Sequence, residues 1–225
     1  MTENQIITQT TQFVQHTLAD AEGGHDWFHI HRVFVNAQLI AKNETANSLV
    51  VALGALLHDI ADAKFYNGDE TIGPKMAEDF LKSIKVEEAT INHVVKIIEN
   101  ISYKSGLKSD DNKVEAEKFS SIELQIVQDA DRLDAIGAIG VARAFNYGGF
   151  KNRALYDPDI HPDLEMTKNK YKKSTAPTIN HFYEKLLLLK DKMNTQTGSK
   201  LAKERHQFML TYLEQFYKEW NGNSK

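Results

Sequence analysis

Helical spacing of apolar residues is the feature that most limits what this chain can fold into. Along its 225 residues, apolar side chains recur at intervals of three and four positions, and only 12 Gly and 4 Pro interrupt them. The period-two alternation typical of strands is scarce. Asp26 is expected to cap one helix and Pro74 to occupy the first position of another. The spacing predicts helices over residues 6–18, 26–41, 46–58, 74–84, 87–101, 122–145, 176–193 and 200–220. We therefore expect an all-α fold.

The composition is that of an ordinary globular chain. Hydrophobic residues make up 41% and charged residues 26%, and 27 Lys and Arg against 31 Asp and Glu give a net charge of −4. Dedicated nucleic-acid binders carry a basic excess, so this class is disfavoured. The absence of Cys excludes disulfides, thiolate metal sites and cysteine nucleophiles. The start of the sequence lacks the features of a signal peptide, and no apolar run reaches membrane-spanning length. We expect a soluble, cytoplasmic protein that does not bind membranes.

A pair of metal-type side chains, His58 and Asp59, directly follows the apolar run LGALL that begins at Leu53. An imidazole nitrogen and a carboxylate oxygen from adjacent residues can bind one divalent cation. The apolar residues should bury their helix, where a charge without a partner is unfavourable and a bound metal would stabilise it. The alternative is a hydrogen-bonded core histidine, and the pair alone does not decide between them.

Two other predicted helices offer ligands of the same kind. His29 falls on the inward stripe of its helix, whereas His31 is turned away from it. In the segment after residue 122, Asp129 and Asp131 cannot both point the same way, which leaves either as a candidate. Two His and two Asp, with water or substrate in the other positions, would suit an octahedral ion. Mn²⁺, Mg²⁺, Fe²⁺ and Ni²⁺ fit such a shell better than a closed tetrahedral zinc site does.

The order of these residues resembles the signature of the HD-domain metal-dependent phosphohydrolase superfamily. The likeness rests on the strings HDWFHIHRV from His25, LLHDI from Leu56 and DADRLDAIG from Asp129. Within the superfamily the sequence resembles a small bacterial branch whose characterised members cleave nucleoside triphosphates to monophosphate and pyrophosphate. The string HFYEKL from His181 also resembles that branch.

The resemblance implies the organisation of the chain. It implies a single HD-type domain over residues 1–225, folded as a helical bundle with extra C-terminal helices. The metal-binding core would span residues 22–145 and the C-terminal helical extension residues 175–220.

The resemblance also implies the metal ligands. These are His29, His58, Asp59 and Asp131. Asp129 is the alternative to Asp131. Some members of the superfamily bind a second metal through further His residues, but His93 is the only His between the central pair and the last Asp. We expect His93 to be an ordinary helix residue. The expected cofactor is one divalent ion, Mn first, with Mg, Fe, Ni or Zn as alternatives.

Charged residues around this signature complete the expected site. Phosphoryl transfer depends mainly on positioning and on neutralising phosphate charge. We expect catalytic roles for Lys64 and Arg132, and substrate binding by His25, Arg32 and Lys104. Asp62 is predicted to act as general base or to orient the attacking water. The structural alternatives are an ion pair between Asp62 and Lys64 and a satisfied loop histidine at His25.

The expected activity is hydrolysis of a nucleotide. In the preferred interpretation, metal-activated water attacks a nucleoside triphosphate and releases monophosphate and pyrophosphate. The enzymatic alternative is a nucleotide phosphomonoesterase or a phosphodiesterase of cyclic or alarmone nucleotides. A non-catalytic nucleotide or metal sensor is the alternative from a different class. The expected partner is a small-molecule nucleotide. The sequence leaves open a homodimer, and whether residues 146–174 form a loop that closes over substrate.

Overall fold

The computed structural model describes residues 1–19, 21, 26–61, 69–101, 119–165 and 174–222. All regular elements in these ranges are helices, and the ranges contain no strand, which confirms the expected all-α fold. None of the helices described is long and apolar enough to span a membrane. The chain divides into two compact units, an N-terminal unit of residues 1–131 and a C-terminal unit of residues 132–225. The single-domain assignment stays a prediction.

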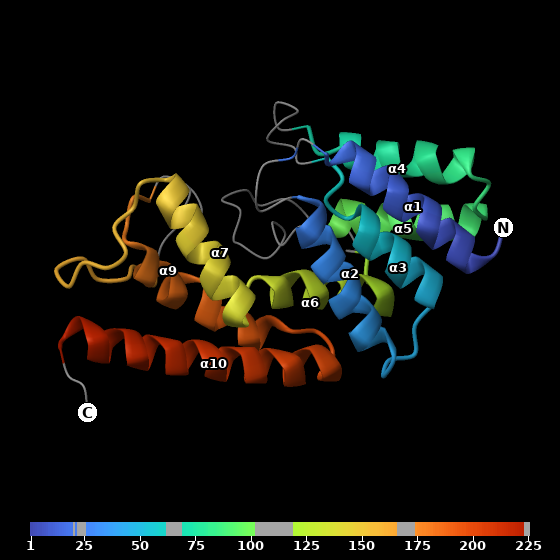
Figure 1. Ribbon diagram of the computed structural model, residues 1–225. Coiled ribbons are helices and arrows are strands. Elements are labelled where there is room, and N and C mark those ends of the chain that lie inside the picture. The colour runs from blue at the N-terminus through green and yellow to red at the C-terminus, as the bar shows by residue number, and fades with distance from the viewer. Residues whose placement is uncertain (20, 22–25, 62–68, 102–118, 166–173, 223–225) are drawn as a thin grey trace, which may run out of the picture. The chain divides into compact units, whose positions relative to one another are not determined.

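The N-terminal unit contains α1 to α5 and most of α6 (Figure 1). Their bounds are α1 Glu3–Thr17, α2 Trp27–Ala41, α3 Ser48–Leu57, α4 Ile72–Ser83, α5 Glu88–Asn100 and α6 Ile122–Asp134. The helices predicted before residue 101 are confirmed to within a few residues. Pro74 is the third residue of α4 rather than the first. It still lies in the first turn, where a missing N–H leaves no helical bond unmade.

Helix α3 lies at the centre of this unit and packs against α1, α2 and α5. Every residue from Val50 to Leu57 is buried. A Cβ on Gly54 would lie 3.3 Å from Ile97 and 3.4 Å from Val127, so the missing side chain lets α5 and α6 approach closely. His58, the residue that follows α3, therefore lies at the end of a buried helix.

A polar network holds the start of α3. The side chain of Asn47 caps the helix, and its backbone N–H donates to Oε1 of Glu123 at 2.9 Å. His93 Nε2 lies 2.9 Å from Oγ of Ser121 and 3.4 Å from Oε2 of Glu123. His93 thus links α5 to the start of α6, which agrees with the expected structural role.

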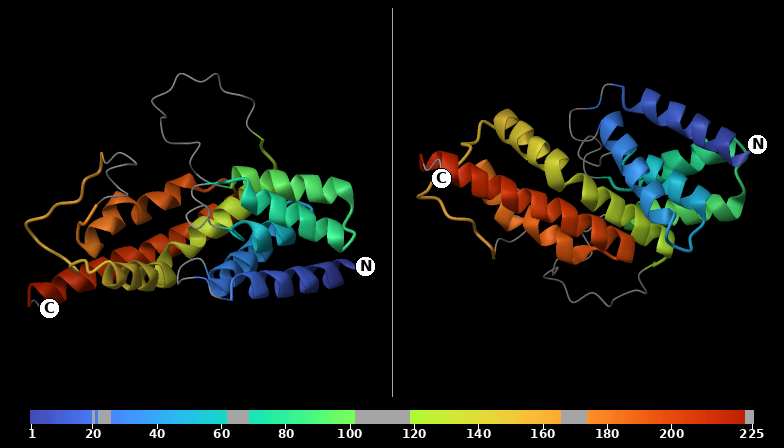
Figure 2. Two further views of the ribbon diagram at one scale, coloured as in Figure 1. Left: turned by 90° about the horizontal axis from the view of Figure 1, so that it is seen from above. Right: turned by 60° about the horizontal axis from the view of Figure 1, so that its bottom comes forward.

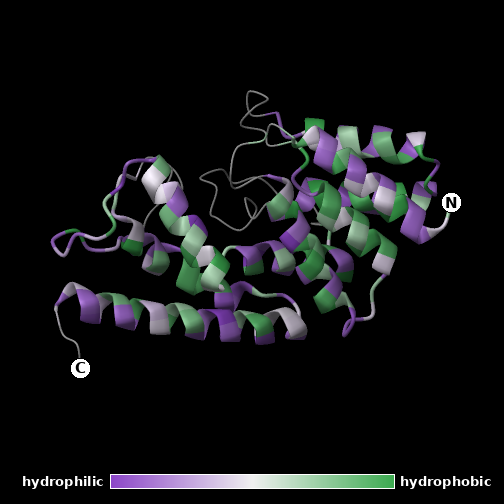
Figure 3. Ribbon diagram, in the orientation of Figure 1, coloured by the Kyte–Doolittle hydropathy of each residue, from purple (hydrophilic) through white to green (hydrophobic). Residues whose placement is uncertain are grey.

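The C-terminal unit contains the end of α6 and the helices that follow it. These are α7 Gly137–Phe150, α9 Thr178–Glu184, the 3₁₀ helix η3 Leu186–Lys192 and α10 Gln196–Trp220. Helix α10 packs against α7 and η3, and Figure 2 shows α7 running along α10 in both views. Figure 3 shows polar and apolar stretches alternating along α10, as expected of a helix with one buried face.

The expectation of one helix over residues 122–145 is wrong, because the chain breaks between α6 and α7. Gly137 has a φ of +77°, a conformation that favours glycine. The last carbonyls of α6 are bonded by distant arginines: Arg205 donates to the Leu133 carbonyl at 2.5 Å and Arg143 to the Asp134 carbonyl at 3.3 Å. These guanidinium groups satisfy the carbonyls that a continuing helix would have used.

Three other predicted boundaries also differ. Helix α7 continues to Phe150, so the irregular segment begins later than residue 146. The helix predicted over residues 176–193 is interrupted at Lys185, whose φ of −144° leaves the helical region, and η3 follows. Helix α10 begins four residues earlier than predicted because the Thr195 side chain accepts a bond from the Gly198 N–H at 2.9 Å.

Helices α7 and α9 meet at Gly148. A Cβ at this position would overlap the hydroxyl of Thr178, so only glycine fits. The Oγ1 atom of Thr178 is buried and finds no hydrogen-bond partner in the part of the chain that the structure describes. The close approach of the Thr178 side chain to the backbone of α7 therefore defines this crossing.

Candidate metal centre

Three side chains of the N-terminal unit bring metal-type ligand atoms together. They are His29 from α2, His58 after α3 and Asp131 from α6, and their ligand atoms all lie within 4.8 Å of one another. His29 Nε2 is 3.6 Å from Asp131 Oδ1, and the two imidazole rings lie edge to face with centroids 5.4 Å apart. Both histidines are buried, whereas the Asp131 side chain is 44% exposed. The group therefore reaches solvent at its carboxylate.

His58 is held in the form that a cation needs. Its Nδ1 lies 2.8 Å from the carbonyl oxygen of Ala55. Because a carbonyl only accepts, Nδ1 is a protonated nitrogen, which leaves Nε2 as the ring atom that can present a lone pair to a cation. Among the described residues, Nε2 has no hydrogen-bond partner although it is buried. A divalent cation would satisfy this lone pair, so the residues fit a metal.

The start of α2 sets the direction of His29. Asp26 Oδ1 accepts a bond from the backbone N–H of His29 at 2.9 Å, which confirms the predicted cap. With Trp27 as the first residue of the helix, His29 is 3% exposed. His31 is exposed, and its ring centroid lies 5.6 Å from that of Trp27. The prediction that His29 points inward and His31 outward is confirmed.

Known proteins resemble this chain over nearly its whole length. Residues 27–136 match the model of the HD domain. The crystal structure of an HD-superfamily hydrolase from Bacillus thuringiensis is 43% identical, with a TM-score of 0.77, and the likeness covers 98% of this chain and 99% of that one. This chain belongs to the HD-domain superfamily of metal-dependent phosphohydrolases.

A second relative is the Bacillus subtilis protein YpgQ. It is 38% identical over 224 residues, which make up 99% of this HD protein and 97% of YpgQ. The crystal structure of YpgQ in complex with ADP has a TM-score of 0.74 and 37% identity, covering 97% of both chains. The likeness to these relatives thus includes the C-terminal unit.

The aspartates of the HD signature differ in their placement. Asp59 is half-buried, and within the described residues its carboxylate does not belong to the group formed by His29, His58 and Asp131. Its role as a ligand stays a prediction. Asp129 is fully buried and also lies outside this group. Of the two aspartates on α6, the geometry therefore favours Asp131 as the ligand.

Two of the predicted phosphate-binding residues are described. Arg32 is half-buried on α2, one turn after His29. Arg132 follows Asp131 on α6, and its Nη1 donates to the carbonyl of Lys192 at 2.8 Å. The roles of both arginines stay predictions. The other predicted residues, His25, Asp62, Lys64 and Lys104, lie outside the described residues.

Sequence reasoning missed two features. The Ala55 carbonyl that fixes the His58 ring is a backbone group, and no residue type marks it. The C-terminal unit also contains a cavity of about 310 Å³ lined by residues of the segment 156–162, α9 and α10. No spacing rule joins a loop to two helices, so the sequence offers no signal for this cavity.

Proposed function

We propose that this HD protein hydrolyses nucleoside triphosphates to the monophosphate and pyrophosphate. The observation that carries the proposal is the group of His29, His58 and Asp131, in which Nε2 of His58 has no hydrogen-bond partner among the described residues. The choice of a nucleotide is supported by YpgQ, which resembles the whole chain and was crystallised with ADP.

The chain's own residues would hold the metal, which we propose to be Mn²⁺. His58 would bind through Nε2, because Nδ1 is engaged by Ala55. His29 and Asp131 would add a second nitrogen and a carboxylate oxygen, and we propose Asp59 as the fourth ligand. This mixed set of nitrogen and oxygen donors suits first-row divalent ions. A bound ion of this kind lowers the pKa of water and polarises a phosphoryl oxygen.

Arginines beside the ligands would hold the substrate. Arg32 lies one turn from His29, and Arg132 is adjacent to Asp131. A guanidinium has five N–H donors and binds phosphate oxygens in pairs. Arg132 donates from Nη1 to the Lys192 carbonyl, and we propose that its guanidinium also contacts a phosphate oxygen of the substrate.

The test is a nucleotide panel incubated with metal-stripped protein after Mn²⁺, Mg²⁺, Ni²⁺ or Zn²⁺ is added back. Phosphate and pyrophosphate are measured separately. We expect pyrophosphate from triphosphates in the presence of Mn²⁺. Phosphate from monophosphates would instead identify a nucleotidase, and metal-dependent nucleotide binding without turnover would identify a sensor.

Substitution of Asp59 tests the fourth ligand. Asp59→Ala should abolish activity and weaken Mn²⁺ binding while the helical circular dichroism signal is retained. If the variant hydrolyses triphosphates at the wild-type rate, Asp59 is not a ligand.

A further inference from the structure

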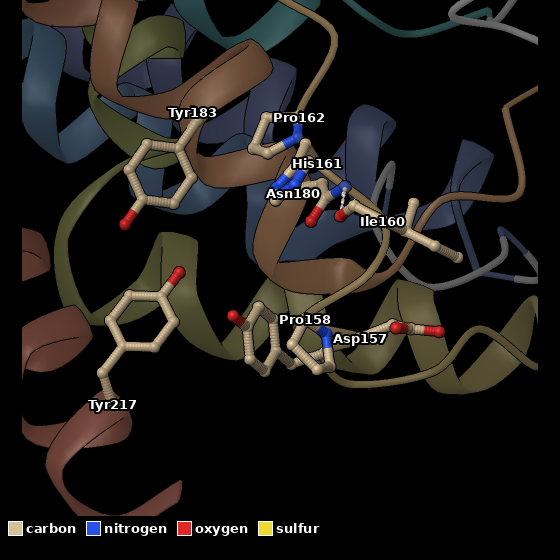
Figure 4. A pocket seen from close by; sticks show the side chains of 9 residues that line it. Asp157, Pro158, Ile160, His161, Pro162, Asn180, Tyr183 and Tyr217 are labelled. Carbon is tan, nitrogen blue, oxygen red and sulfur yellow. Dashed lines mark hydrogen bonds between the residues drawn. The ribbon is translucent and has the colours of Figure 1, made fainter. Parts of the chain in front are cut away.

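The cavity of the C-terminal unit plays no part in the proposed reaction. Its volume of about 310 Å³ lies at the lower end of the range for small-molecule sites. Tyr156, Tyr183 and Tyr217 contribute aromatic walls from the loop, α9 and α10 respectively. Figure 4 shows Tyr183 and Tyr217. The cavity is therefore assembled from three separate segments of one unit.

The aromatic walls are held in place by their neighbours. The ring of Tyr156 lies edge to face with Tyr217, Phe216 and Trp220, at centroid distances of 5.3, 6.0 and 5.0 Å. Figure 4 shows the hydroxyls of Tyr183 and Tyr217 turned toward one another. Burial raises the pKa of Tyr217, and its hydrogen bond with Tyr183 raises it further, so this phenol stays neutral.

Two side chains of the cavity, Asn180 and Asp157, supply hydrogen-bond acceptors. Asn180 is 1% exposed, and its Nδ2 donates to the Ile160 carbonyl at 2.9 Å. This bond orients the amide, whose Oδ1 is a hydrogen-bond acceptor. Asp157 adds a carboxylate whose Oδ1 accepts from the Asp159 backbone N–H at 2.9 Å. The described lining contains this one acidic side chain and the imidazole of His161, and neither Lys nor Arg.

We propose that this cavity binds a small organic cation, a molecule with a quaternary ammonium or protonated amine group. Aromatic rings attract such cations, and the Asp157 carboxylate supplies the opposite charge. The acceptor oxygens of Asn180 and the tyrosines suit N–H donors of a protonated amine. Phosphate-bearing molecules are disfavoured because the described lining contains neither Lys nor Arg. The proposal does not depend on the metal centre.

The test is titration of the full-length protein with choline and with agmatine. Trp220 packs on Tyr156, so in a Trp27→Phe background the tryptophan fluorescence reports on the cavity wall and not on the metal centre. We expect a saturable fluorescence change with at least one cation, and neither adenosine nor inorganic phosphate should cause one at the same concentrations. Failure of both cations to change the fluorescence, or an equal response to adenosine, would overturn the proposal.

Two matched substitutions test the charge. Asp157→Asn keeps an oxygen for the Asp159 N–H and removes the carboxylate, so it should weaken cation binding about tenfold. Asp159→Asn changes an exposed acid two residues away that is not part of the lining, and it should have no effect. Equal effects of the two substitutions would overturn the proposal.

A third substitution tests the aromatic wall. Tyr183→Leu removes one aromatic face and should also weaken cation binding. Unchanged affinity for the cation would contradict an aromatic site.

Discussion

The metal centre and the tyrosine-lined cavity are built in different ways. Each candidate ligand of the metal centre lies on a helix or directly after one, and each of these helices is marked in the sequence by a stripe of buried apolar residues. The cavity joins an irregular segment to the short helix α9 and to α10. Metal ligands must converge to within a few ångströms, which packed helices achieve, whereas a cavity for a small molecule tolerates wider spacing. Sequence periodicity therefore reveals the first kind of site and not the second.

The largest expected effect separates two histidines of one helix. His29→Ala removes a buried ligand and should reduce affinity for Mn²⁺ by more than about 100-fold, beyond the loss caused by outer-shell substitutions. His31→Ala removes an exposed ring on α2 and should leave the affinity unchanged. Isothermal titration calorimetry on metal-stripped protein measures both. An equal loss in the two variants would contradict the assignment.

The C-terminal unit should be the more acid-sensitive of the two. Burial lowers the pKa of His181 from 6.5 to about 4, and the positive charges of Lys185 and Arg153 act in the same direction. The unfolded chain therefore takes up a proton at a higher pH than the folded one. The contribution of His181 to the free energy of unfolding is fully present above pH 6.5. It should fall by about 3 kcal/mol as the pH drops to 4.

His181→Gln should flatten this dependence between pH 4 and 6.5. Urea unfolding of wild type and variant across that window measures the free energy of unfolding. If the free energy of unfolding of the variant falls with pH as steeply as that of the wild type, another group causes the loss of stability.

A smaller effect is expected at Glu123 in the N-terminal unit. Burial alone would raise its pKa, but backbone N–H groups, including that of Asn47, together with His93 and Ser121, hold it below the usual 4.5. Its stabilising contribution is present above pH 4.5 and is lost as the pH falls further. Glu123→Gln should lower the free energy of unfolding by about 1 kcal/mol at pH 7.

The matched control for Glu123 is Glu99→Gln, which changes an exposed residue of α5. It should be neutral in the same urea unfolding experiment. If both substitutions lower the free energy of unfolding by the same amount, the network around Glu123 makes no specific contribution to stability.

How much of the structure can be predicted from the sequence depends on whether the stabilising contacts join residues that are near or distant in the sequence. The burial of His29 follows from the spacing of neighbouring apolar residues, and the cap at Asp26 is a local bond. The break after α6 depends on Arg143 and Arg205, which reach its last carbonyls from α7 and α10. A local pattern contains no information about such bonds. The choice between Asp129 and Asp131 likewise needs the direction of both side chains relative to the histidines.

The contact between Gly148 and Thr178 limits the order in which these two residues can be substituted during evolution. A side chain at residue 148 would collide with the Thr178 hydroxyl, so Gly148→Ala is harmful while threonine is present. The hydroxyl has no partner among the described residues, so Thr178→Ala breaks no hydrogen bond there. An evolving lineage can therefore change residue 178 first and residue 148 afterwards, but not the reverse. Homologues with alanine at 148 should carry a residue smaller than threonine at 178.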